Sequence, residues 1–132
     1  MLGFLTEVGP FYLEDGKDYK KGDKLTRNNY TWAKVSNLLF IESPAGVGFS
    51  TNDEKDKSIN DTITAKDMLQ SIVSFRKKFP NLANRDFWIS GESYAGKYIP
   101  DLAREIDLFN QNNPKAQIPL KGLLIGNGVM TF

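Results

Sequence analysis

Hydrophobic residues follow two different patterns along the chain. Short apolar runs within residues 38–41, 86–90 and 120–125 predict strands, the first of them covered on both faces. Within residues 59–79 and 99–109 the apolar positions recur mostly three or four apart, as on one face of a helix. The resulting order of strand, helix, strand, helix, strand is typical of an α/β fold with a parallel sheet.

Capping and breaking residues predict where the helices end. Asn60 or Asp61 can cap the first helix, and Pro80 stops it. Pro100 lacks the N–H that a helix interior uses. We therefore expect a short turn from Ser93 and a fresh helix with Pro100 near its first position.

Two shorter features precede the first long helix. Residues 11–13 and 25–27 are strand candidates on either side of a charged, turn-rich stretch, and we expect them to pair as a hairpin. Residues 44–48 hold one proline and two glycines, which predicts a tight loop, and residues 51–58 are a polar loop exposed to water.

The composition of the 132 residues excludes several classes of function. No apolar run approaches the roughly 18 residues that span a bilayer, so we expect no membrane span. A net charge of +1 with mixed signs argues against nucleic acid as the main partner. The sequence has no cysteine and no histidine, so this chain alone supplies no thiolate or imidazole ligand for a metal and no complete Ser-His-Asp triad.

One motif carries candidate chemistry. Residues 91–95 fit the pattern G-x-S-x-G with alanine at the last position, and they lie between a predicted strand and a predicted helix. This is the context of a nucleophile elbow, which lifts the Ser93 hydroxyl above the sheet edge and makes the Tyr94 N–H an oxyanion donor. The alternative is a tight turn with an idle serine.

Four blocks in order resemble the serine carboxypeptidases, a family of α/β-hydrolases. Residues 91–100 are similar to the family's active-serine segment, and the other blocks are residues 7–11, 32–50 and 120–128. The resemblance covers essentially the whole chain. It implies a partial α/β-hydrolase fold, with residues 1–132 forming a single partial domain.

The resemblance also implies roles for four residues. Ser93 would be the acylated nucleophile, and the Tyr94 N–H half of the oxyanion hole. Glu92 and Glu7 would hydrogen-bond each other and hold the C-terminal carboxylate of a peptide or protein substrate, with no metal or cofactor. Two carboxyls in contact share a proton, so binding would favour acidic pH. The alternative for both glutamates is a solvated carboxylate.

The chain also departs from the family pattern. The family's Asn-Gly-Gly-Pro-Gly segment would lie upstream of Met1, and its Asp and His would follow far downstream of Ser93. We therefore expect a piece of a catalytic domain, cut at both ends, that has no activity and aggregates in isolation. An acyltransferase of the same family and a non-catalytic remnant or binding protein are the alternatives.

Other residues are interpreted more simply. Glu42 is expected to be structural, Trp32 and Trp88 to lie in or near the core, and residues 17–24 to form a solvated loop. Asn29 and Asn60 begin N-x-[ST] triplets, which are candidate glycosylation sites. No signal peptide is visible, and the resemblance implies a lysosomal, vacuolar or secreted protein.

Overall fold

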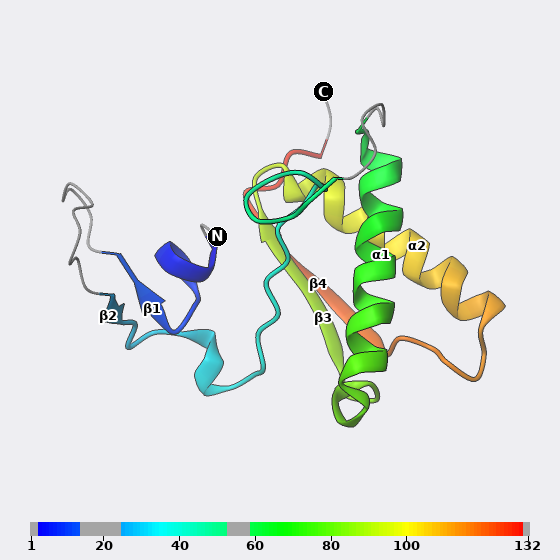
Figure 1. Ribbon diagram of the computed structural model, residues 1–132, viewed down its shortest axis with the longest axis horizontal. Helices are drawn as coiled ribbons and strands as arrows, with labels where there is room; N and C mark the ends of the chain where they lie inside the picture. The colour runs from blue at the N-terminus through cyan, green and yellow to red at the C-terminus, as the bar shows by residue number, and fades with distance from the viewer. Residues whose placement is uncertain (1–2, 14–24, 53–58, 131–132) are drawn as a thin grey trace. The chain divides into compact units, whose positions relative to one another are not determined.

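Two groups of elements make up the structure, a computed structural model that describes residues 3–13, 25–52 and 59–130 (Figure 1). Contacts divide the chain into unit 1, residues 1–42 and 47–50, and unit 2, residues 43–46 and 51–132. The single domain expected over residues 1–132 stays a prediction. The stretch expected to be a solvated loop at 17–24 lies outside the described residues, as does most of the loop at 51–58.

Unit 1 is built around a short hairpin. Its elements are the helical turn η1 (Gly3–Glu7), the strands β1 (Phe11–Tyr12) and β2 (Thr26–Arg27), and the helical turn η2 (Trp32–Lys34). The two strands pair antiparallel, with Phe11 opposite Arg27. The predicted hairpin is confirmed.

Asn28 holds the turn between η1 and β1 in place. Its side chain is buried at 7% exposure, and its amide nitrogen donates to the carbonyls of Glu7 and Gly9, both at 2.9 Å. The Thr31 hydroxyl donates to the Val8 carbonyl at 2.8 Å. These bonds satisfy backbone acceptors that the turn itself leaves unpaired, so the segment around Glu7 has a defined path.

Unit 2 has the predicted alternation of strands and helices. Its elements are α1 (Asp61–Lys78), the helical turn η3 (Pro80–Leu82), β3 (Phe87–Glu92), α2 (Ala95–Asn112) and β4 (Leu120–Gly126). The strands β3 and β4 pair in parallel, as predicted. Helix α2 packs against both strands, and α1 packs against α2 (Figure 1).

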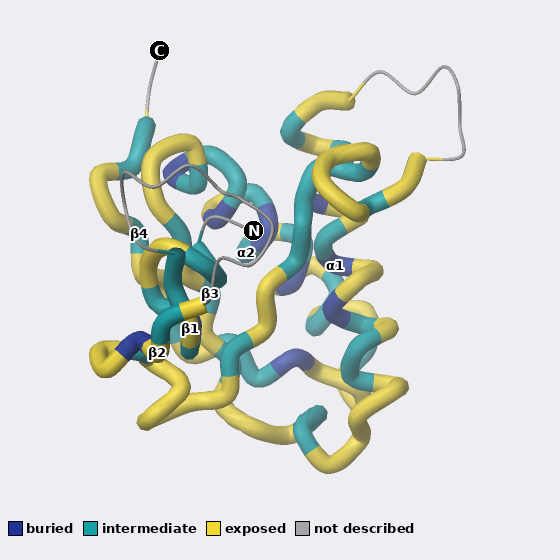
Figure 2. The backbone as a smooth tube through the Cα atoms, turned by 60° about the vertical axis from the view of Figure 1, so that its left-hand side comes forward, coloured by how far each residue is buried: buried dark blue, intermediate teal, exposed yellow. Residues whose placement is uncertain are grey.

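The core of unit 2 lies between the two helices and beneath the sheet. Buried apolar residues recur on one face of each helix, as the spacing predicts: Ala65, Leu69 and Ile72 on α1, and Ile99, Leu102 and Ile106 on α2, joined by Ile118 from the loop before β4 (Figure 2). Burying a side chain of this size contributes about 1.5–3 kcal/mol. The core thus fixes α2 against β3, where the candidate nucleophile follows.

The ends of α1 follow the prediction, and the start of α2 does not. The Asn60 side chain caps α1 by accepting from the Ile63 N–H, and Pro80 begins the next turn. Pro100, however, lies inside a continuous α2 that starts at Ala95. The prediction that a new helix begins near Pro100 is therefore wrong. Proline removes one bond there, and the burial of Ile99 and Leu102 keeps the helix intact.

The prediction of a strand at residues 38–41 is also wrong. These residues are half-buried or exposed and form no strand, because none of the described segments pairs with them. A strand forms only with a hydrogen-bonded neighbour, which the sequence pattern of a single segment does not provide.

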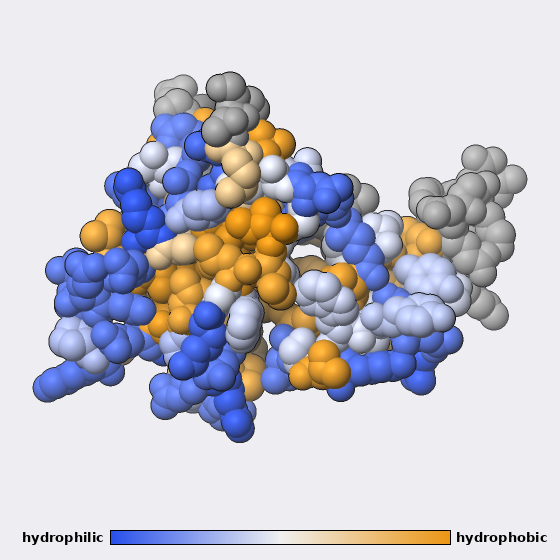
Figure 3. Space-filling model, turned by 180° about the vertical axis from the view of Figure 1, so that it is seen from behind, coloured by the Kyte–Doolittle hydropathy of each residue, from blue (hydrophilic) through white to orange (hydrophobic). Residues whose placement is uncertain are grey.

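One face of the β3–β4 sheet carries no helix among the described residues. Trp88 is 55% exposed and Leu124 45% exposed, so the expectation that Trp88 lies in or near the core is wrong, as it is for Trp32, which is 42% exposed. Trp88 lies over its register partner Gly122, where a Cβ would collide with the indole ring. Figure 3 shows the apolar residues gathered on this side of the molecule.

Arg76 ties three segments of unit 2 together. Its guanidinium donates to the carbonyls of Ala83, Ala116 and Gln117 at 2.6–3.0 Å. Partial burial lowers the pKa of Arg76 from its usual value. The end of α1 is thereby joined to the loops that lead into β3 and β4.

Candidate active site

Ser93 occupies a sharp turn between β3 and α2. Strand β3 ends at Glu92, and α2 begins at Ala95. Ser93 is exposed and has a φ of +59°, a left-handed conformation that costs an ordinary residue about 1–2 kcal/mol. A strained serine between a strand and a helix is the geometry that the sequence motif predicts for a nucleophile elbow.

Backbone hydrogen bonds hold this turn on both sides. The Ser93 N–H donates to the Gly126 carbonyl at 3.0 Å, which continues the pairing of β3 with β4. The Ser93 carbonyl accepts from the N–H groups of Gly96 at 3.0 Å and Val129 at 2.9 Å. These three bonds stabilise the strained conformation.

Small residues around the turn are required by close backbone approach. A Cβ on Gly91 would lie 2.6 Å from the Ala95 Cβ, and one on Gly96 would lie 2.5 Å from the Val129 carbonyl oxygen. The first and last positions of the motif are therefore small for a steric reason.

Tyr94 lies directly before α2 with a helical φ of −61°. Its hydroxyl donates to the Asp61 carboxylate, 3.2 and 3.3 Å from the two oxygens, and its ring meets Tyr98 edge-on at 4.8 Å. Partial burial, with the nearby Asp61 carboxylate, raises the pKa of the Tyr94 phenol. The phenol therefore stays a protonated donor at neutral pH.

The two candidate carboxylate-binding glutamates belong to different units. Glu7 is the exposed last residue of η1 in unit 1, and Glu92 is the exposed last residue of β3 in unit 2. Glu92 therefore directly precedes the candidate nucleophile in the chain. The pairing of the two carboxyls stays a prediction.

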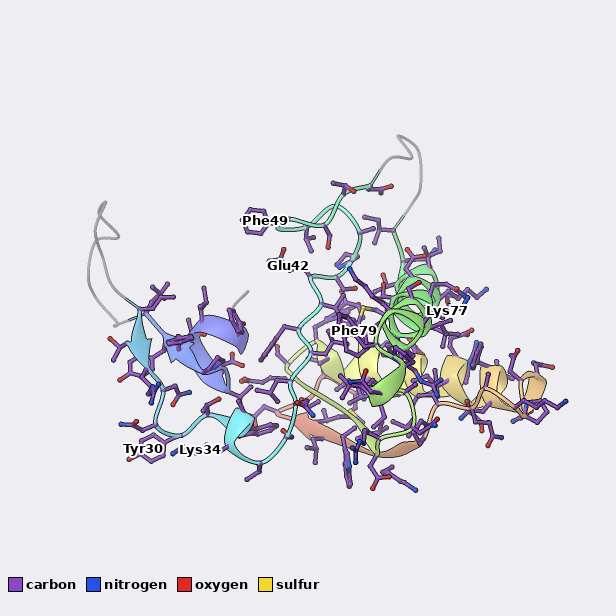
Figure 4. All side chains as sticks on the ribbon, turned by 60° about the horizontal axis from the view of Figure 1, so that its bottom comes forward. Tyr30, Lys34, Glu42, Phe49, Lys77 and Phe79 are labelled. Carbon is purple, nitrogen blue, oxygen red and sulfur yellow. The ribbon has the colours of Figure 1, made fainter. Side chains whose placement is uncertain are left out.

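The Glu42 side chain holds a tight loop. It accepts from the Phe49 N–H, which lowers the pKa of Glu42, and the Ser50 hydroxyl donates to the Glu42 carbonyl at 2.7 Å. Gly48 has a φ of +56° and a Cβ there would collide with the Glu42 carboxylate. The predicted tight loop is confirmed and Glu42 has a structural contact, while the Phe49 ring is 84% exposed and projects away (Figure 4).

Three further expectations concern glycosylation, metal binding and membrane-spanning helices. Asn29 and Asn60 are both exposed, and their glycosylation stays a prediction. Within the described ranges no group of three or more histidine, cysteine or acidic residues could hold a metal ion. None of the described helices has the length and apolar character needed to cross a membrane.

The sequence patterns missed three residues whose side chains hold distant segments together, each within its own unit. Asn28, Asp61 and Arg76 each form at least one hydrogen bond with a residue 19 or more positions away. Asn28 and Arg76 carry no motif, and the sequence predicts Asp61 only as a possible helix cap. Arg76 begins a run of three basic residues and Asn28 stands beside a second asparagine, so neither has a sequence signal that separates it from its neighbours.

Comparison with known proteins identifies relatives over the whole chain. A family model described as serine carboxypeptidase matches residues 1–132. Serine carboxypeptidase-like 21 of Arabidopsis thaliana is 46% identical over 130 residues, and Serine carboxypeptidase 24 of the same plant is 46% identical over 129 residues. These alignments cover 98% and 96% of this chain but 26% and 27% of the relatives, so the chain spans about a quarter of their length.

A solved structure shows the same fold. The crystal structure of Kex1(Δ)p, a prohormone-processing carboxypeptidase from Saccharomyces cerevisiae, matches 98% of this chain and 28% of its own, with a TM-score of 0.81 and 36% identity. The predicted partial α/β-hydrolase fold is confirmed. With the strained Ser93 turn in place and a family model that matches every residue, this chain belongs to the serine carboxypeptidase family.

Proposed function

We propose that the protein carrying this segment is a serine-type carboxypeptidase that uses Ser93 as its nucleophile. The observation that carries the proposal is the left-handed Ser93 between β3 and α2, within a chain of this family. The protein would remove the C-terminal residue of peptides or proteins without a metal or other cofactor.

The chemistry divides into two acyl transfers. The Ser93 oxygen attacks the carbonyl carbon of the last peptide bond, and its proton passes through a general base to the departing amino group. The Tyr94 N–H stabilises the negative oxygen of the tetrahedral intermediate. Water then attacks the acyl-enzyme, gives its proton to the base, and releases the shortened peptide as Ser93 is restored.

The general base has to come from outside this sequence, because the sequence contains no histidine. A serine without a base is a weak nucleophile, and enzymes that lose a triad residue lose up to about a million-fold in rate. The 132-residue chain by itself is therefore the natural negative control for any assay.

Glu7 and Glu92 are proposed to recognise the substrate's terminal carboxylate. If their carboxyls share one proton, the protonated group donates a hydrogen bond to that carboxylate. As pH rises through the apparent pKa of the pair, the second ionisation places like charges together and weakens binding. Binding of free-acid peptides then favours the acidic side, whereas an amidated peptide has no such charge.

The test compares substrates in the full-length protein. We expect release of the C-terminal amino acid from a blocked dipeptide, with a KM that rises with pH for the acid and stays flatter for the amide. Replacing both glutamates by glutamine removes the titration, so the two pH profiles should become parallel. Identical profiles for acid and amide in the unchanged protein would contradict the role of the glutamates, without touching the role of Ser93.

The same acyl-enzyme could instead transfer its acyl group to an alcohol. Several relatives carry the name serine carboxypeptidase-like, which keeps this alternative open. Glu7 and Glu92 together favour a peptide carboxylate as the recognised group. Adding an alcohol acceptor to the assay separates the two, since a transferase yields the ester faster than the free acid.

A lysosomal, vacuolar or extracellular site of action belongs to the same proposal. Exposed Asn29 and Asn60 in N-x-[ST] triplets are consistent with passage through the secretory route. A fall in mass after treatment with a glycan-removing enzyme would support it, and an unchanged mass would oppose glycosylation at both residues.

A further inference from the structure

One side-chain hydrogen bond joins the beginning of α1 to the candidate active site. The Tyr94 hydroxyl lies 3.2 and 3.3 Å from the carboxylate oxygens of Asp61, although the two residues are 33 positions apart. Asp61 is the first residue of α1, and Tyr94 is the residue between Ser93 and α2. Figure 1 shows the first turns of both helices at the same end of unit 2.

Asp61 is not needed as the cap of its own helix. Asn60 fills that role, since its side-chain oxygen accepts from the Ile63 N–H at 2.9 Å. The Asp61 carboxylate is therefore available to the Tyr94 hydroxyl. At 3.2 and 3.3 Å the hydroxyl lies across both carboxylate oxygens, at a distance longer than the roughly 2.5–3.0 Å of a short O–H···O bond.

The Tyr94 ring is held at two points. The hydroxyl at its tip is bound to Asp61, and its side meets the Tyr98 ring edge-on at 4.8 Å. Fixing both contacts restricts the two side-chain torsions of Tyr94 and tethers its Cα, the atom to which the backbone nitrogen is attached. A displacement of about 1 Å in a reacting group can cost about a hundred-fold in rate.

We propose that Asp61 is a positioning residue, which holds the Tyr94 ring and thereby aims the Tyr94 N–H at the developing oxyanion. The proposal rests on the proposed function, because it concerns the oxyanion donor of that reaction. Asp61 itself touches neither substrate nor nucleophile in this account. Its effect should appear in the chemical step and in the binding of transition-state analogues more than in substrate affinity.

The charges that face the Tyr94 hydroxyl support the contact. The carboxylates of Asp61 on α1 and Asp101 on α2, and the phenol of Tyr98, all act with partial burial to raise the pKa of Tyr94. Removing the Asp61 charge should therefore lower that pKa towards its ordinary value. This titration reports the contact in solution independently of activity.

The experiment uses the full-length protein with the variants Asp61→Asn, Asp61→Ala, Tyr94→Phe and the double variant Asp61→Ala/Tyr94→Phe. The matched control is Asp67→Ala, an exposed aspartate on the same helix. We expect Asp61→Ala and Tyr94→Phe each to lower kcat about ten- to a hundred-fold, with KM changed by less than about three-fold. Affinity for a peptide boronate, which mimics the tetrahedral intermediate, should fall in parallel with kcat.

The double variant distinguishes positioning from a general loss of structure. If the two side chains act as one unit, the double variant is no slower than the worse single variant. Asp61→Asn keeps an acceptor of the same shape and should recover part of the kcat that Asp61→Ala loses. Ultraviolet titration of the Asp61 variants, with the Tyr94→Phe protein subtracted as the reference, should show a lower pKa for the Tyr94 phenol than in the unchanged protein. Asp67→Ala should leave all of these values unchanged.

Two results would overturn the proposal. The first is an Asp61→Ala protein with full kcat and full boronate affinity. The second is a loss of kcat that multiplies in the double variant, since independent effects would show that the bond between the two side chains carries no function. The Ser93→Ala variant, measured in parallel, shows which of the two proposals fails. If Ser93→Ala retains turnover, the proposed function fails. If Ser93→Ala is inactive while the Asp61 variants are fully active, only the positioning role of Asp61 fails.

Discussion

Replacing Ser93 by alanine in the full-length protein is expected to lower kcat for a blocked dipeptide by about a million-fold, the loss seen when a serine protease loses its nucleophile. The reason is that no other group is positioned to form the acyl-enzyme, so only binding and the oxyanion hole remain. Initial rates of the Ser93→Ala variant and of the unchanged protein, measured at equal concentrations of folded protein and saturating substrate, give the ratio of the two kcat values. Ser90→Ala is the matched control, because Ser90 is an exposed serine three residues earlier on β3.

A glycine at the same position should separate activity from strain. Ser93→Gly removes the hydroxyl as alanine does, but glycine adopts a φ of +59° without steric cost. We therefore expect equal inactivity and a free energy of unfolding about 1 kcal/mol higher for the glycine variant than for the alanine variant. Equal stability of the two variants would mean that the turn is not strained in solution.

Replacing Gly96 by alanine is expected to destabilise the protein by about 1–3 kcal/mol, the usual range for overpacking, and towards its upper end because the neighbouring atoms are backbone. The added Cβ would lie 2.5 Å from the Val129 carbonyl oxygen and 2.6 Å from the Val129 nitrogen, and both are backbone atoms that cannot turn away. The displaced Val129 would also lose its bond to the Ser93 carbonyl. Denaturant unfolding of the full-length protein measures the change.

Gly126 provides the control for that experiment. A Cβ there would lie 3.8 Å from the Glu92 Cγ and 3.9 Å from the Gly91 oxygen, which are ordinary contacts. Gly126→Ala should therefore change the free energy of unfolding by less than about 1 kcal/mol. If Gly96→Ala were as stable as Gly126→Ala, the close approach of α2 to Val129 would not exist in solution.

Local signals predicted the elements that carry the site. Apolar spacing, a cap at Asn60 and small residues around Ser93 predict a strand at 86–90, which the structure has at 87–92, together with both helices and the elbow. The start of α2 is the part that differs. Such signals work because helix capping and turn sterics depend on nearby residues. The candidate nucleophile could therefore be assigned from its immediate neighbours.

Features that depend on distant partners could not be predicted in the same way. Residues 38–41 have the composition of a strand but lack a described neighbour to pair with, and Pro100 sits inside a helix that packing holds together. The bond between Asp61 and Tyr94 joins residues that only the packing of α1 on α2 brings together. Residues 38–41 form no strand because no described segment pairs with them, packing overrode local propensity at Pro100, and the packing of the two helices created the bond between Asp61 and Tyr94.

Covalent labelling of Ser93 tests the central claim most directly. A fluorophosphonate reacts with an activated serine to form a stable adduct, and digestion followed by mass spectrometry locates it. In the full-length protein we predict one adduct, on the peptide that contains Ser93, with loss of carboxypeptidase activity in step with labelling and no adduct in Ser93→Ala. An adduct on a different residue that abolishes activity, or full turnover by a protein labelled at Ser93, would contradict the account.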